Sequence, residues 1–122
     1  MKKGNVIQEK SFAFAVRIVN LYKYLCEEKK EFILSKQLLQ AGTSIGANVE
    51  EAIGGQSEKD FFAKLTISYK EARETHYWLR LLKATDYLSD QESYSLLSDV
   101  EELLKIIGSI QKTIRNSKTP NS

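Results

Sequence analysis

Residues 57–86 read SEKDFFAKLTISYKEARETHYWLRLLKATD and contain the longest periodic pattern in the chain. Its apolar and small residues recur at alternating steps of four and three: Phe61, Leu65, Ser68, Ala72, Thr75, Leu79 and Leu82. This spacing places them on one side of a helix, as in the contact seam of a helical bundle. Ser57 and Asp60 resemble a capping box at its start. The stretch therefore predicts a long helix that ends near Asp86 and needs other helices to cover its apolar side.

Two shorter helical patterns precede this stretch. Over about residues 10–29 the apolar positions are Phe12, Ala15, Val16, Val19, Tyr22 and Cys26, widened by Ile18, Leu21 and Leu25. Ser35 can then cap a second helix, with Leu34 and Leu39 as a hydrophobic staple. This helix should end at Gly54 and Gly55, because glycine accepts the left-handed backbone that often terminates a helix.

A fourth pattern starts with Ser89 and Glu92, which form another capping box. Its apolar positions continue to about Arg115: Leu97, Val100, Leu104, Ile107, Ile110 and Ile114. Short connections between long helices favour antiparallel neighbours, so the sequence predicts an all-α, antiparallel up-down-up-down four-helix bundle. We place this domain at residues 10–115, between a basic N-terminal tail (1–9) and a disordered C-terminal tail (116–122).

Composition limits the classes of function. The chain has 18 Lys and Arg residues against 16 Asp and Glu, and this balance alone does not indicate a nucleic-acid-binding protein. Cys26 is the single cysteine, which excludes an intrachain disulfide and favours a reducing compartment. No apolar run has the length of a membrane span, and the start of the chain lacks the pattern of a targeting segment. We therefore expect a cytoplasmic protein without membrane contact.

A catalytic or metal site is not expected. His76 is the only histidine, whereas a di-iron bundle needs Glu-x-x-His pairs on two helices. Together, Cys26 and His76 supply too few ligands for structural zinc. Cys26 also falls on an apolar pattern, where a free cysteine acts as a small hydrophobe, so a Cys26–His76 nucleophilic pair is disfavoured. The sequence predicts no enzyme activity, no cofactor and no metal.

Residues 40–52, QAGTSIGANVEEA, are unusually small and polar for a bundle helix. Each internal glycine costs about 1 kcal/mol relative to alanine, so we expect a neighbouring backbone to approach closely there. Asn48 shares a helical face with Leu38, Ala41, Ile45 and Ala52. Its amide should enter or border the apolar seam, where Ser44 can supply a hydrogen-bond partner. Asn48 then either fixes the helix register or belongs to a ligand site.

The same segment carries a resemblance to a family. Gln37, residues 44–51 (SIGANVEE), residues 60–61 (DF) and residues 68–75 (SYKEARET) resemble four-helix-bundle proteins encoded in intervening sequences of bacterial 23S ribosomal RNA genes. The likeness covers roughly residues 10–115. The family pattern Ser-Ile-x-Ala-Asn-Ile-x-Glu-Gly is matched by Ser44, Ile45, Ala47, Asn48 and Glu51. Ala52 replaces the usual glycine, and Gln40 and Gly42 lie where the family usually carries an Arg-Ala pair.

The resemblance implies a bundle that assembles into a homopentamer and has no established enzymatic activity. The chain is also similar to accessory proteins of diversity-generating retroelements, which are pentameric bundles that bind a reverse transcriptase and nucleic acid. The partners implied in this way are further copies of the chain, RNA or DNA, and a ribonucleoprotein or reverse transcriptase.

A basic stripe within residues 57–86 is the candidate nucleic-acid-binding surface. Its members recur at i, i+3, i+7 and i+10: Lys70, Arg73, Tyr77 and Arg80. Such a stripe can pair with phosphates and stack a base. The alternative is an ordinary solvated face, because Glu74 lies one turn from Lys70 and Glu71 is nearby. A symmetric oligomer would repeat the stripe, so we expect polyanion binding to depend on assembly.

A protein-interaction scaffold without nucleic-acid binding is the competing hypothesis. Four aromatic residues lie off the main seam of residues 57–86: Phe62, Tyr69, Tyr77 and Trp78. Exposed aromatic side chains favour protein interfaces.

Overall fold

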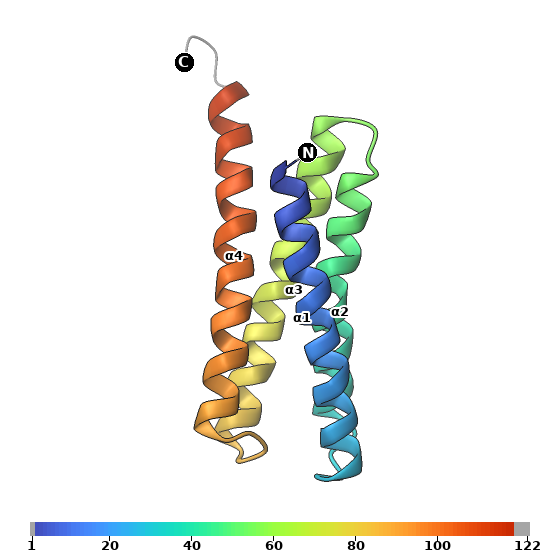
Figure 1. Ribbon diagram of the computed structural model, residues 1–122, viewed down its shortest axis with the longest axis vertical. Coiled ribbons are helices and arrows are strands. Elements are labelled where there is room, and N and C mark those ends of the chain that lie inside the picture. The colour runs from blue at the N-terminus through green and yellow to red at the C-terminus, as the bar shows by residue number, and fades with distance from the viewer. Residues whose placement is uncertain (1, 119–122) are drawn as a thin grey trace.

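The computed structural model describes the backbone of residues 2–118 and the side chains of residues 6–117. It contains four helices: α1 (Lys2–Glu27), α2 (Leu34–Ile53), α3 (Glu58–Ala84) and α4 (Asp90–Lys118). Each helix packs on the next, and α4 also contacts α1, as Figure 1 shows. The short connections 28–33, 54–57 and 85–89 make consecutive helices antiparallel. The predicted up-down-up-down four-helix bundle is therefore confirmed.

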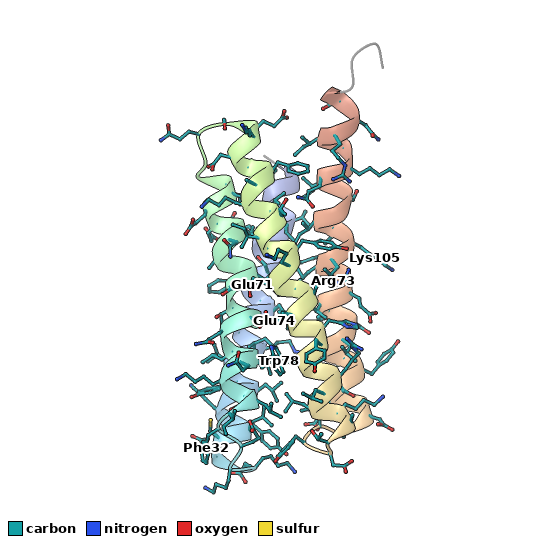
Figure 2. All side chains as sticks on the ribbon, turned by 180° about the vertical axis from the view of Figure 1, so that it is seen from behind. Phe32, Glu71, Arg73, Glu74, Trp78 and Lys105 are labelled. Atoms are coloured by element: carbon teal, nitrogen blue, oxygen red, sulfur yellow. The ribbon has the colours of Figure 1, made fainter. Side chains whose placement is uncertain are left out.

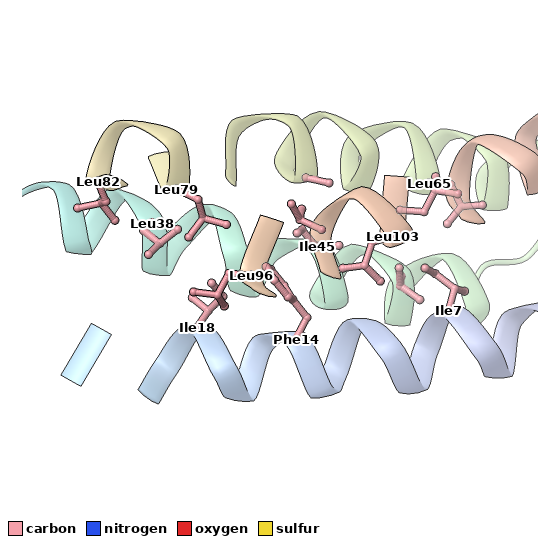
Figure 3. Packing of buried hydrophobic residues seen from close by; sticks show 14 of the residues in the cluster. Ile7, Phe14, Ile18, Leu38, Ile45, Leu65, Leu79, Leu82, Leu96 and Leu103 are labelled. Carbon is pink, nitrogen blue, oxygen red and sulfur yellow. The ribbon is translucent and has the colours of Figure 1, made fainter. Parts of the chain in front are cut away.

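The inward face of α3 is the one that its spacing predicts. Phe61 is half-buried, and the other six seam residues are buried: Leu65, Ser68, Ala72, Thr75, Leu79 and Leu82. Figure 3 shows three of these leucines meeting apolar side chains from the other helices, including Phe14, Ile45 and Leu103. The polar Ser68 is satisfied inside this core, because its hydroxyl donates to the Ile45 carbonyl of α2 at 2.8 Å.

The buried side of α1 differs from the predicted one. Its buried residues are Ile7, Ser11, Phe14, Ile18 and Leu25. Phe12 and Val16, which we predicted to face the core, are 66% and 47% exposed. The prediction was wrong because α1 carries apolar residues on two opposite sides, and periodicity alone does not decide which side packs.

The predicted tails also need correction. Helix α1 begins at Lys2, so residues 2–9 are helical and do not form a tail. Ile7 is fully buried, and the burial of its side chain stabilises the helical conformation of these first residues. At the other end, α4 runs to Lys118, and residues 119–122 of the predicted C-terminal tail lie outside the described residues.

Close packing of α1 on α2 explains the two glycines inside α2. A Cβ atom on Gly42 would lie 2.8 Å from two side-chain carbons of Ile18, and one on Gly46 would lie 3.3 Å from the Ser11 carbonyl oxygen. Both distances are shorter than ordinary contacts between carbon atoms or between carbon and oxygen. The predicted close approach is confirmed, and glycine is what permits it.

The start and end of α2 are stabilised differently from the prediction. Ser35 is buried inside the helix and does not cap it; the carboxylate of Glu31 instead accepts the backbone N–H groups of Ser35 at 2.7 Å and Leu34 at 3.0 Å. At the other end, Gly54 has φ −80° and is not left-handed. Gly55 instead leaves room for the Asp60 carboxylate, because a Cβ atom at position 55 would lie 2.5 Å from it.

The caps of α3 and α4 agree with the sequence. Ser57 accepts the Asp60 N–H at 3.0 Å. Ser89 and Glu92 form a complete capping box, in which each side chain accepts the backbone N–H of the other, at 3.1 and 3.0 Å. These local signals fix where both helices begin.

The core side of α4 is rotated slightly from the predicted stripe. Val100, Ile107 and Ile110 are buried as predicted, whereas Leu97, Leu104 and Ile114 are only partly buried. Leu96 and Leu103 complete the buried apolar set of α4, which also buries the polar residues Ser93 and Gln111.

The contact between α4 and α1 combines buried apolar residues, such as Phe14 and Leu103, with ion pairs at the surface. Arg17 donates to Asp99 at 2.6 Å and to Ser95 at 3.1 Å, and the Lys10 ammonium lies 3.4 Å from Glu102. Among the described residues, no helix has the length and apolarity needed to cross a membrane.

Candidate nucleic-acid interface

The four residues of the predicted basic stripe are all exposed on α3: Lys70, Arg73, Tyr77 and Arg80. A surface cleft of about 600 Å³ borders three of its members, Arg73, Tyr77 and Arg80. It is lined by Tyr69, Arg73, Glu74, His76, Tyr77, Arg80 and Leu104. The cleft runs over α3 toward α4, so a ligand on the stripe would also meet α4.

Arg80 is held in place by neutral partners. Its Nε–H donates to Nδ1 of His76 at 3.1 Å, and its guanidinium lies 5.8 Å from the centre of the Tyr77 ring. The other ring nitrogen of His76 lies 3.0 Å from a carboxylate oxygen of Glu101. These two contacts fit a neutral imidazole with its proton on Nε2. Within residues 6–117, the terminal nitrogens of Arg80 form no hydrogen bond or ion pair, so the arrangement orients a cation without neutralising it.

A basic residue that the sequence reasoning missed lies on α4. Figure 2 shows Lys105 on the same side of the molecule as Arg73, across the boundary between α3 and α4. Lys105 is exposed, and in the described part of the chain it forms no ion pair. Lys112 follows seven residues later and is also exposed. This heptad spacing is the signal that could have revealed a second basic stripe beside the first.

The stripe has acidic neighbours, but its own cations are unpaired. Over residues 6–117, neither Lys70 nor Arg73 forms an ion pair. Glu74 instead accepts a hydrogen bond from the Trp78 indole at 3.1 Å. Burial raises the pKa of the Glu71 carboxyl, the Glu74 carboxylate adds to this rise, and Lys70 opposes it. Figure 2 shows Glu71 and Trp78 on the side of α3 toward α2, away from Lys105.

The residues that match the family pattern lie along α2: Ser44, Ile45, Ala47, Asn48 and Glu51. Ile45 is fully buried, and Ala47 and Glu51 are exposed. Asn48 is half-buried, and its amide donates to the Ser44 carbonyl at 2.8 Å, so Ser44 supplies a partner through its backbone. Glu51 forms an ion pair with Lys64 of α3 at 3.1 Å. These contacts join turns of α2 to each other and to α3.

Cys26 and His76 have different neighbours. The Cys26 sulfur lies 3.8 Å from the Ser35 hydroxyl near the start of α2, while His76 contacts Arg80 and Glu101. Across the described residues, no group of three or more His, Cys, Asp or Glu side chains is placed to hold a metal ion.

The aromatic residues behind the scaffold hypothesis are neither free nor fully buried. Tyr69 and Trp78 pack partly against the core, Phe62 is half-buried and Tyr77 is 50% exposed. The Tyr77 and Trp78 rings meet edge to face, with centroids 5.1 Å apart.

Comparison with protein families matches residues 3–109 to the 23S rRNA-intervening sequence proteins. Among solved structures, the chain is similar to a Bacteroides thetaiotaomicron protein of unknown function from the S23 ribosomal protein family. The two are 54% identical, the match covers 90% of this chain and 98% of that one, and the TM-score is 0.89. No curated protein matches. Neither description names an enzyme activity.

Proposed function

Because the chain belongs to the family of 23S rRNA-intervening sequence proteins, we propose that it is a non-enzymatic, self-assembling bundle that binds RNA through the basic stripe of α3. The observation that carries the proposal is a set of exposed cations on one side of the bundle that form no ion pair with any of the described side chains: Lys70, Arg73, Arg80 and Lys105. Unpaired cations can replace the counterions of a phosphate backbone, which is the main source of affinity for nucleic acid.

The aromatic members of this surface favour single-stranded nucleic acid. Tyr77 presents an exposed ring beside Arg73 and Arg80, and an unpaired base can stack on such a ring. A base inside a duplex cannot reach it without unstacking. The proposal therefore assigns phosphate contacts to the cations and base stacking to Tyr77.

Self-association completes the proposal. The homopentamer implied by the family resemblance would place five copies of the stripe on one particle, and weak contacts would add through multivalency. Partners of this kind include RNA or DNA with unpaired bases and a ribonucleoprotein such as a reverse transcriptase with its RNA. Such contacts would take place in the cytoplasm.

A salt titration with labelled single-stranded RNA tests this function. We expect the wild-type chain to retard the RNA at low salt. The affinity of the R73A/R80A variant for the RNA should be lower by about tenfold or more. Each lost phosphate contact should lower the slope of log affinity against log salt by about 0.7, so the double variant should lose about 1.4. Oligomer mass should stay unchanged, because both side chains are exposed.

The matched control is K29A/K36A, which removes two exposed lysines near the connection between α1 and α2. It lowers the net charge by the same amount but leaves the stripe intact, so RNA affinity should stay close to wild type. Wild-type protein that fails to retard RNA at low salt would contradict the proposal.

The scaffold alternative keeps one specific observation in its favour, the half-exposed pair of Tyr77 and Trp78. It predicts a chain that self-associates and binds no RNA at any salt concentration. The same titration therefore separates the two functions.

A further inference from the structure

The outward side of α1 is more apolar than a solvated helix face. We define the outer face of α1 as Glu9, Phe12, Ala13, Val16, Val19, Asn20 and Lys23. On this face, Phe12 is 66% exposed, Val16 is 47% exposed and Val19 is half-buried. Leaving such side chains in water forgoes the free energy that their burial would provide. This face therefore has the character of a contact surface.

The two charged residues of the outer face form no ion pair among residues 6–117. The other charged residues along this part of α1 are paired with α4, Lys10 with Glu102 and Arg17 with Asp99. In contrast, Glu9 and Lys23 form no ion pair with any described residue. Both are exposed.

The positions of these charges specify what can cover the face. Glu9 lies seven residues before Val16 and Lys23 lies seven residues after it. When two identical helices pack antiparallel about a two-fold axis through Val16, residues equally distant from Val16 face each other. Glu9 of each copy then meets Lys23 of the other, and Ala13 meets Val19. Phe12 of each copy lies opposite Asn20 of the other, so a second copy of this chain matches the face in charge at its two ends and in apolar character around Val16.

We infer that the outer face of α1 packs antiparallel against the same face of a second copy, centred on Val16. The inference rests on the self-association included in the proposed function and identifies one surface for it. The contact is two-fold, so it joins two chains, or two rings, and does not by itself build a ring of five. One helix from each copy makes a small interface, so the association should be weak and dependent on concentration and salt.

A charge exchange tests the pairing. The variants E9K and K23E each place like charges opposite one another twice in the contact, and the double variant E9K/K23E restores both pairs with their signs reversed. We expect the concentration for half-association, measured by sedimentation equilibrium at low salt, to rise about tenfold in each single variant. The double variant should return close to the wild-type value. K36E, a matched reversal on the exposed side of α2, should have no effect.

A second variant tests the centre of the contact. V16E places a carboxylate on the axis, opposite its own copy, and should abolish the association while leaving the helical circular dichroism unchanged, because Val16 is exposed. Single variants that associate like wild type, a double variant that does not recover, or a wild-type monomer at every concentration would overturn the inference. RNA binding is read separately: its absence together with rescue of the mass by E9K/K23E would reject the proposed function and leave this contact standing.

Discussion

Helix α1 is held on its two sides by different physical means. Toward α2, Gly42 and Gly46 let the backbones approach until Ile18 and Ser11 fill the space above them. Toward α4, the contact includes the ion pair of Arg17 with Asp99 and that of Lys10 with Glu102. The first seam depends on close backbone packing, whereas the second adds ion pairs at the surface to the apolar contact of residues such as Phe14 and Leu103. We therefore expect the two seams to respond differently to added volume and to salt.

The largest effect should come from filling the shape-dependent seam. We expect G42L to lower the free energy of unfolding by about 3 kcal/mol or more, because the new side chain has to displace the fully buried Ile18. Urea denaturation followed by circular dichroism measures this loss.

Gly46 provides the control within the same seam. A Cβ atom there meets a backbone oxygen at 3.3 Å, so G46A adds mild crowding while it gains about 1 kcal/mol of helix propensity. The two contributions should nearly cancel. Equal losses at the two glycines would contradict the account of this seam.

A smaller effect should come from the connection that joins α1 to α2. Glu31 is 9% exposed, and burial alone would raise the pKa of its carboxyl, but the N–H donors of Leu34, Ser35 and Ile33 outweigh burial and lower this pKa. We expect E31Q to lose about 1 kcal/mol of stability near neutral pH, because it removes a charge-assisted cap.

The difference in stability between wild type and E31Q should depend on pH. The stabilisation by Glu31 is fully present above the ordinary glutamate pKa of 4.5 and is lost as the pH falls through the lowered value of the folded state. Unfolding curves of wild type and E31Q should therefore converge as the medium becomes strongly acidic. A difference that stays constant across this range would contradict the role of the carboxylate.

The smallest effect should come from the ion pairs between α1 and α4. Arg17 and Asp99 are 40% and 43% exposed, and pairs of this kind contribute at most about 1 kcal/mol. R17A should lower the free energy of unfolding by this amount at low salt and by much less at about 1 M salt, where screening acts over about 3 Å. Salt should leave the loss caused by G42L unchanged, which separates the two seams in one pair of denaturation series.

The difference between α3 and α1 shows what the sequence could predict about the fold. Along α3, the seam residues recur at alternating steps of four and three over seven positions, and this long regular pattern identified the buried face correctly, although aromatic residues also lie off the seam. Along α1, Phe12 and Phe14 are both large and apolar, yet only Phe14 is buried. The choice depends on where Gly42 and Gly46 let α2 approach, and this is a property of the assembled pair of helices.

The sequence predicted the part of the candidate site that lies on one helix and did not predict the part that lies on another. The stripe on α3 could be found because its members belong to one helix and share one face. Lys105 was missed because it lies on another helix, and only the packing of α3 beside α4 brings it near Arg73. Likewise, the cap by Glu31 was missed because its carboxylate reaches forward into the next helix, whereas Ser35 offered the usual local signal.

Light scattering of the purified chain, with absorbance recorded at the nucleic-acid and protein maxima, shows at once whether the chain assembles and whether it binds nucleic acid. We expect a particle of several chains that carries nucleic acid at low salt and releases it at high salt without losing all of its mass. A monomer that is free of nucleic acid under every condition would contradict this expectation.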